Sequence, residues 1–149
     1  MSVSAEGVYQ GQVTWVEGLQ FVARGLSSKA AFVLDGDAAH GGLDSGVRPM
    51  EALLLSLAGC TGMDVISVLR KKRQRVTGFH VSVSGTRAAE HPKRYVRIDL
   101  EFVIRGYDIS ERAVVRAIEL SQGKYCGVTA SLNSEIVTSF RIEEEALDS

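Results

Sequence analysis

The sequence predicts an α+β domain, and three features of the residue pattern lead to this prediction. Short alternating strands fill the first third, a proline-free run of helix formers extends from 50 to 73, and longer alternating strands occupy the second half. With two shorter helices, these features give the order β-β-β-α-β-β-α-α-β without a repeat or a linker. The length of 149 residues fits a single domain over residues 1–149.

The first third has the period-two pattern of short strands. Val13 and Trp15 alternate with polar neighbours, Phe21 and Ala23 do so again after a glycine, and the apolar run 30–34 leads into a turn. Strands this short, separated by turn residues, are typical of an antiparallel meander. We therefore expect a small antiparallel sheet at the start of the chain.

A long central helix is the strongest element that the sequence predicts. The glycine-rich segment 40–46 has the composition of a mobile surface loop, and Pro49 suits the first turn of a helix. Helix formers then continue from 50 to 73. The first half of this run is apolar almost all round, which is typical of a helix surrounded by protein. A chain of this size offers too little cover for such a helix, so we expect a homodimer.

The second half predicts the remaining strands and two shorter helices. Apolar and polar residues alternate from 96 to 104, as in a strand with one buried face. Ser110 can cap a second helix, for which Gly123 is the expected stop. The other expected elements are strands at 79–84 and 136–142 and a short helical turn at 126–132.

Charge and motifs exclude several classes of function. With 17 basic and 18 acidic side chains, the chain has no overall attraction for nucleic acid, and the basic run 70–75 suits a solvated helix end. His40, His80 and His91 lack the spacing of metal ligands, so we expect no metal. The glycines match no phosphate-binding fingerprint, so we expect no nucleotide or other cofactor.

The N-terminal residues resemble no secretion signal, and the apolar stretch 52–58 is too short to cross a bilayer. We therefore expect a cytoplasmic protein that does not bind membranes. In a reducing compartment the two cysteines, Cys60 and Cys126, are normally thiols.

Both cysteines lie in unusual local sequences. Cys60 is within a helix between Gly59 and Gly62, and glycines there suggest that another group approaches the backbone closely. Cys126 follows a helix stop, close to Lys124, where a thiolate would be favoured. Two interpretations remain open from the pattern: a peroxidatic and resolving pair, or two unrelated buried thiols.

Two segments carry a resemblance to a known family. PMEALLLSLAGCTGMDV at 49–65 and SQGKYCGV at 121–128 look like the paired signature segments of the OsmC/Ohr family (osmotically inducible protein C and organic hydroperoxide resistance), most closely its YhfA-like branch. The resemblance implies the OsmC-like fold and an intertwined homodimer with two sites at the interface. It also implies a cytoplasmic thiol peroxidase that reduces organic hydroperoxides. Cys60 falls on the peroxidatic position and Cys126 on the resolving one, with a lipoamide-type dithiol as reductant.

The sequence departs from the family pattern at the expected activator of the thiol. Met50 stands where peroxidase members carry a carboxylate, which comes one residue later at Glu51. Helix geometry of about 100° per residue places Glu51 roughly opposite Cys60. Glu51 then serves the partner subunit's site or simply caps the helix start.

The supporting arginine is also left open, between Arg24 and Arg48. The leading prediction is a peroxidase for small apolar hydroperoxides, with Leu57 and Met63 near the thiol. The alternative is a protein of the same fold that binds a small molecule or senses redox state without turnover.

Overall fold

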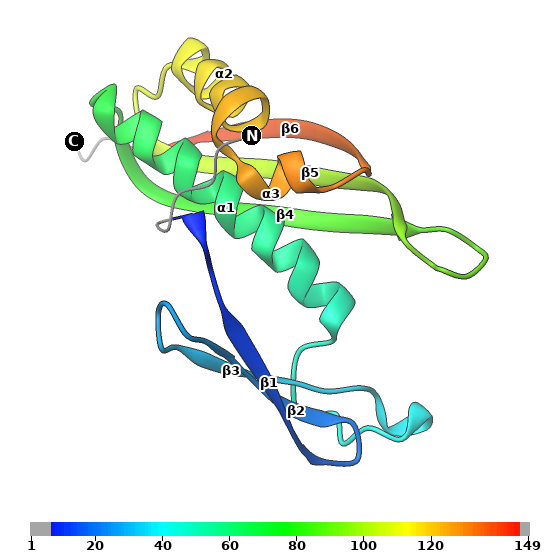
Figure 1. The fold of residues 1–149 in the computed structure, drawn as a ribbon. Helices are drawn as coiled ribbons and strands as arrows, with labels where there is room; N and C mark the ends of the chain where they lie inside the picture. Colours follow the sequence, from blue (N-terminus) through cyan, green and yellow to red (C-terminus); the bar gives the residue numbers. More distant parts are fainter. Residues whose placement is uncertain (1–6, 147–149) are drawn as a thin grey trace. The chain divides into compact units, whose positions relative to one another are not determined.

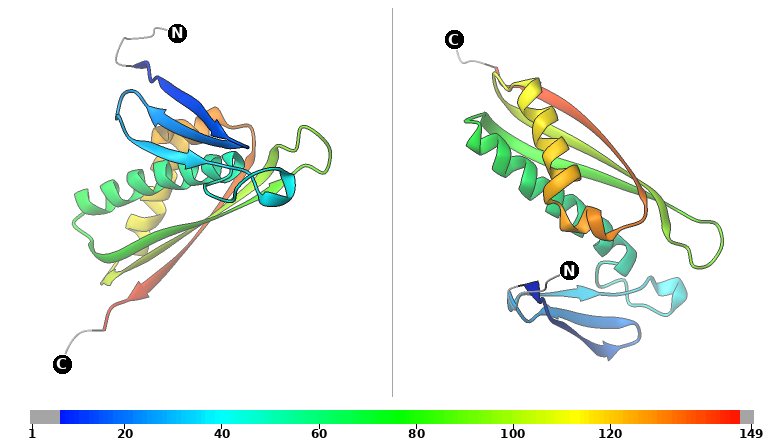
Figure 2. Two further views of the ribbon diagram at one scale, coloured as in Figure 1. Left: turned by 90° about the horizontal axis from the view of Figure 1, so that it is seen from below. Right: turned by 45° about the horizontal axis from the view of Figure 1, so that its top comes forward.

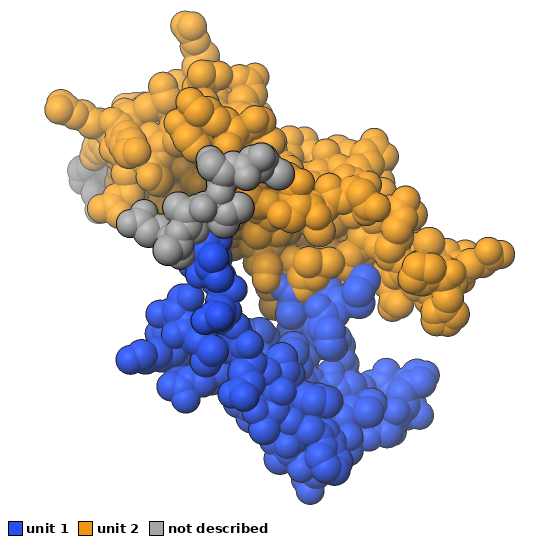
Figure 3. Space-filling view, in the orientation of Figure 1, with its two compact units in different colours: residues 1–52 blue, residues 53–149 orange. Residues whose placement is uncertain are grey.

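The computed structural model describes residues 7–146 (Figure 1). In chain order its elements are β1 (Gly11–Glu17), β2 (Gln20–Gly25), β3 (Ala31–Leu34), the 3-10 turn η2 (Ala38–His40), α1 (Pro49–Lys71), β4 (Arg75–Arg87), β5 (Tyr95–Tyr107), α2 (Glu111–Leu120), the π-turn η3 (Ser121–Tyr125), α3 (Gly127–Ser131) and β6 (Glu135–Glu144). The predicted α+β class and the order of its strands and α-helices are confirmed. The chain forms two compact units, residues 1–52 and 53–149, which are coloured separately in Figure 3 and described in turn below. The expected single domain stays a prediction.

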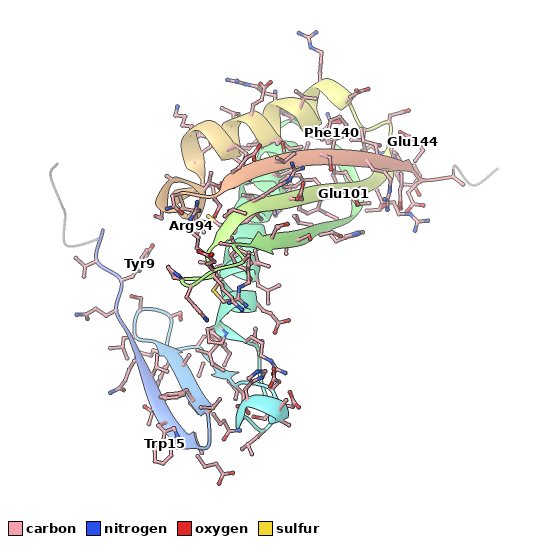
Figure 4. The ribbon with its side chains drawn as sticks, turned by 90° about the vertical axis from the view of Figure 1, so that its right-hand side faces the viewer. Tyr9, Trp15, Arg94, Glu101, Phe140 and Glu144 are labelled. Carbon is pink, nitrogen blue, oxygen red and sulfur yellow. The ribbon has the colours of Figure 1, made fainter. Side chains whose placement is uncertain are left out.

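The first unit is built on the expected antiparallel meander, in which β2 pairs with both β1 and β3. Trp15 lies opposite Phe21 across the first hairpin, and its indole Nε1 donates to the carbonyl oxygen of Gly18 at 2.9 Å. Figure 4 shows the Trp15 side chain projecting from β1. Among the described residues of this unit, Ala23 is the one buried apolar residue. The large apolar side chains that remain exposed are those of Val8, Tyr9, Val13, Trp15, Val16, Leu19, Val22, Leu26, Phe32 and Leu43.

A buried carboxylate organises the glycine-rich loop of the first unit. Asp35 is 1% exposed, and it accepts hydrogen bonds from the backbone N–H groups of Gly36 at 2.7 Å, Leu43 at 3.2 Å and Ser45 at 3.2 Å. The Ser45 hydroxyl donates to the same carboxylate. The segment 40–46, which was expected to be a mobile loop, follows η2 and is held around Asp35, because its backbone donors at Leu43 and Ser45 converge on this one buried acceptor.

The second unit has a three-stranded sheet in the order β4-β5-β6, with β4 and β5 antiparallel and β5 and β6 parallel. The parallel pair requires a crossover, which α2, η3 and α3 supply. Figure 4 shows Glu101 of β5 and Phe140 of β6 on these neighbouring strands. The alternation expected at 96–104 holds from Ile98 onward, except that Val103 on the outward face of the central strand is only 2% exposed.

Helices α1 and α2 cover the same face of this sheet (Figures 1 and 2). From the second unit, α1 contributes the buried residues Leu57, Ala58, Thr61, Gly62, Val65 and Leu69. However, Leu55 is 55% exposed and Met63 is 73% exposed. Within this unit the sheet covers one side of α1, so the expectation that protein surrounds the first half of the helix depends on a second copy and stays a prediction.

By length and composition, α1 is a helix that could cross a membrane, although the apolar stretch 52–58 was expected to be too short. The helix of 23 residues is longer than that stretch because its apolar residues continue beyond residue 58 with Met63, Val65, Ile66, Val68 and Leu69. The core helices of soluble proteins meet the same criterion, and α1 packs on a sheet through six residues. Length and composition are therefore weak support for a membrane span.

The segment after α2 departs from the expected simple helix stop. Ser110 caps α2 as predicted, since its hydroxyl oxygen accepts from the N–H of Ala113 at 3.2 Å. The α-helix ends at Leu120, and Gly123 lies inside the π-turn that follows. The N–H of Cys126 donates to the carbonyl oxygen of Ser121 at 2.8 Å and closes this wider turn. Single π-helical turns at helix ends or within helices are frequent at functional sites.

Candidate functional site

The second unit brings the two cysteines together. Cys60 is half-buried on α1, and Cys126 is 4% exposed at the N-cap of α3. Their sulfur atoms and a carboxylate oxygen of Asp64 all lie within 4.8 Å of one another. Both cysteines are free thiols. The two thiols are therefore neighbours in this unit, and their peroxidatic and resolving roles stay predictions.

Hydrogen bonds hold Cys126 at its position beside α1. Its Sγ accepts from the backbone N–H of Thr129 at 3.3 Å, while its own N–H bonds to Ser121 across the π-turn. Ser121 is fully buried, and its hydroxyl donates to Oδ2 of Asp64 at 2.9 Å. One short segment thus positions a thiol and also contacts a carboxylate on the helix.

Asp64 is a site residue that the sequence reasoning missed. It lies four positions after Cys60 in the segment CTGMD of α1, so the two side chains share one helix face. That four-residue spacing in the sequence is the signal that could have identified it. Within residues 7–146, the one group of potential metal-ligating side chains is Cys60, Asp64 and Cys126.

The surroundings of Cys60 favour its neutral thiol. Burial is the largest cause that raises its pKa above the ordinary value, and the hydrogen bond with Cys126 raises the pKa further. A hydrogen bond from the backbone N–H of Val128 acts in the opposite direction, and the charges of Cys126 and Asp64 add to the increase. This unit therefore does not by itself generate a reactive thiolate, and activation requires a positive charge.

The glycines around Cys60 differ in their surroundings. An added Cβ at Gly62 would lie 3.4 Å from Cγ2 of Val81 and 3.6 Å from Cε1 of Phe79, so the helix lies close to β4 there. An added Cβ at Gly59 would meet nothing within 4 Å in the described chain. A Cβ at Gly62 would thus make ordinary contact with β4, and the expected unusually close approach is found at neither glycine within the described chain.

A cavity of about 520 Å³ adjoins Asp64. Its wall is partly apolar and ends at two lysines of the helix C-terminus. Its lining residues are Asp64, Ser67, Val68, Lys71, Lys72, Leu120 and Tyr125. Leu57 and Met63, the two apolar residues that were expected near Cys60, differ in exposure. Leu57 is fully buried, whereas Met63 is exposed to solvent.

The residues expected to activate the thiol all belong to the first unit. A carboxylate oxygen of Glu51 accepts from the backbone N–H of Arg48 at 3.0 Å, so Glu51 caps the start of α1. The Arg48 guanidinium donates to the carbonyl oxygen of Gly46 at 3.0 Å and pairs with Asp44. Arg24 is exposed on β2. The catalytic roles of these three residues stay predictions.

The order of elements and the α+β scaffold that carries the two thiols match one known family of proteins. The model of the OsmC-like protein family matches residues 41–141, and the chain belongs to this family. It is similar to Protein YhfA of Escherichia coli, with 36% identity over 127 residues that cover 85% of this chain and 91% of the relative. That similarity supports the YhfA-like branch of the family.

Solved structures show the same fold. A hypothetical protein from Aquifex aeolicus is 28% identical, covers 93% of this chain and 98% of its own, and superposes with a TM-score of 0.81. An organic hydroperoxide resistance protein from Elizabethkingia anophelis is 12% identical over 93% of this chain and 98% of its own, with a TM-score of 0.62. The second likeness concerns the fold alone.

Proposed function

We propose that the protein is a thiol peroxidase that reduces organic hydroperoxides through Cys60 and Cys126. The observation that carries this proposal is the placement of the two free sulfur atoms within 4.8 Å of each other. The name of the structural neighbour from Elizabethkingia anophelis, an organic hydroperoxide resistance protein, agrees with it. Membership of the OsmC-like family supports the same class of chemistry.

The chemistry consists of three balanced steps. The Cys60 sulfur attacks one peroxide oxygen, so that the O–O bond breaks, an alcohol leaves and the thiol becomes a sulfenic acid. The Cys126 sulfur then attacks the sulfenic sulfur, forming a disulfide and releasing water. A dithiol of the lipoamide type finally exchanges with this disulfide, which restores both thiols and leaves the reductant as a cyclic disulfide. No metal or nucleotide enters these steps.

A homodimer supports this chemistry in two ways. The exposed apolar side chains of the N-terminal sheet and of α1 suit burial against a second copy. A second copy also offers another Arg24, Arg48 and Glu51 as activators. The cationic charge that Cys60 requires is therefore proposed to come from one of these arginines after assembly.

Two free thiols suit a reducing compartment, and the proposed location is the cytoplasm.

The second candidate function is a protein that binds a small molecule or senses redox state without turnover. The raised pKa of Cys60 favours it, because a neutral thiol reacts slowly with peroxide. The methionine at position 50, in place of the family's carboxylate, points the same way.

Turnover separates the two candidates. Reduced protein is supplied with cumene hydroperoxide and excess dihydrolipoamide, and the alcohol product is measured over many equivalents per chain. A peroxidase gives multiple turnovers that fall to background in Cys60→Ser, while Cys126→Ser stops after one equivalent. Ser131→Ala, on exposed α3, is the matched control and retains full activity. Product that never exceeds one equivalent in the unmodified protein would overturn the peroxidase proposal in favour of the second candidate.

A further inference from the structure

The group formed by Cys60, Cys126 and Asp64 has the donor atoms of a zinc site. Two thiols and a carboxylate offer two sulfur ligands and one oxygen ligand, all within 4.8 Å of one another. Bond lengths of about 2.3 Å for Zn–S and about 2.1 Å for Zn–O place tetrahedral ligand atoms roughly 3.7 Å apart. Changes of about one ångström in side-chain position would therefore close the site, because all three side chains start from one side of α1 and the adjoining turn.

The surrounding groups orient these three side chains. Ser121 donates to Oδ2 of Asp64 at 2.9 Å, which leaves the other carboxylate oxygen for a ligand bond. Backbone N–H groups donate to each sulfur, from Val128 to Cys60 and from Thr129 to Cys126. Supporting hydrogen bonds of this kind fix the ligands of protein metal sites and hold thiolate charge in place.

The charge of the group also favours a cation. Cys60, Cys126 and Asp64 would carry three negative charges if all were ionised, and like charges held this close to one another repel. A bound cation reverses this relation, because coordination deprotonates a thiol outright.

We propose that the reduced chain binds one thiophilic divalent cation of the Zn²⁺ type through Cys60, Cys126 and Asp64. Binding exchanges up to two thiol protons for the metal and leaves a fourth position for water or an added ligand. The proposal stands independently of peroxidase activity, because it concerns the thiols and the carboxylate alone. It has one consequence for oxidation: Zn²⁺ and a hydroperoxide compete for the same sulfur atoms.

The test is metal binding by the full-length reduced protein. Zn²⁺ is titrated against a chromophoric chelator, and Co²⁺ is titrated separately for its sulfur-to-metal charge-transfer absorption. We expect one metal ion per chain, the charge-transfer band, and loss of both in Cys60→Ser. Asp64→Asn should weaken binding, and Ser121→Ala should weaken it by at least about 10-fold. Matched controls are Asp99→Asn and Ser82→Ala, both on the sheet, which should bind as the unmodified chain does.

Two results would overturn the site. One is Zn²⁺ binding that persists after both thiols are alkylated, because the metal would then bind elsewhere. Alkylation requires no substitution, so this result does not depend on whether a variant folds. The other is Asp64→Asn with unchanged affinity in a folded protein, which removes the carboxylate from the ligand set. Failure of peroxidase turnover would alter neither readout, so the two proposals fail separately.

Discussion

The ionised carboxylate of Asp35 stabilises the loop that surrounds it. The Ser45 hydroxyl is the main cause that lowers its pKa below the ordinary value, burial opposes this, and the N–H groups of Ser45, Gly36 and Leu43 lower the pKa further. A lowered native pKa means that the stabilisation is complete above the unfolded pKa and is lost as pH falls through the native one. Asp35→Asn should therefore lower the free energy of unfolding at pH 7. The difference in this free energy between the variant and the unmodified protein should become smaller below about pH 4.

Urea unfolding of the full chain at a series of pH values checks this prediction. Glu90→Gln, on the exposed hairpin loop between β4 and β5, is the control and should show no such difference. If the difference in free energy of unfolding between Asp35→Asn and the unmodified protein stayed constant from pH 7 to acidic pH, the side chain would act through its shape and not through its charge.

The two cysteines of the candidate site could be predicted from the sequence, whereas its carboxylate could not. Cys60 and Cys126 lie in two distinctive segments, and the helix and turn that hold them could be inferred from the residue pattern. Asp64 shares the helix face of Cys60 through its four-residue spacing, but its place near Cys126 depends on how the π-turn packs against α1. Local pattern does not determine that packing, because it depends on contacts between residues distant in sequence.

At the scale of elements, the packing of α1 on β4 depends on Gly62. Gly62→Leu should destabilise the protein by about 1–3 kcal/mol, because the added atoms would press on Val81 and Phe79. Gly59→Leu has open space and is the matched control, with a change near zero or slightly stabilising from better helix propensity. Thermal unfolding of both variants measures the difference. Equal stability of the two variants would contradict the close packing at Gly62.

The elements themselves followed from the sequence where periodicity was long. The order of strands and α-helices and the cap at Ser110 were predictable from alternation and capping residues. The end of α2 was not, because the bond from the Cys126 N–H to Ser121 widens the turn before Gly123 is reached. Burial of Val103 was also missed, because on the outer face of the central strand it is flanked by its ladder partners His80 of β4 and Arg141 of β6.

At the scale of the whole molecule, the exposed apolar surface needs an explanation beyond one chain. The N-terminal meander has one buried apolar residue among those described, and α1 leaves Leu55 and Met63 in solvent. Isolated apolar residues on a surface are ordinary, but the many exposed apolar side chains of the N-terminal sheet, and separately those of α1, support the proposed burial against a second copy. The sequence indicated that the rest of the chain cannot cover the apolar helix. It could not show that the N-terminal sheet also has an uncovered apolar face, because short strands alternate in the same way whether their apolar face is buried or exposed.

The proposed homodimer predicts that a charge placed on the exposed apolar side of α1 separates the subunits. Leu55 is 55% exposed on α1, and Leu55→Glu would place a carboxylate in the buried interface without disturbing the core of its own chain. An unpaired buried charge costs several kcal/mol, so a dimer should shift to monomer at micromolar concentration. Val115→Glu is the matched control, since Val115 is 37% exposed on α2, and it should leave the mass unchanged. Light scattering after gel filtration gives the mass directly. An unmodified protein that already runs as a monomer would contradict the proposed dimer, and with it the proposed route by which a second copy supplies the activating arginine.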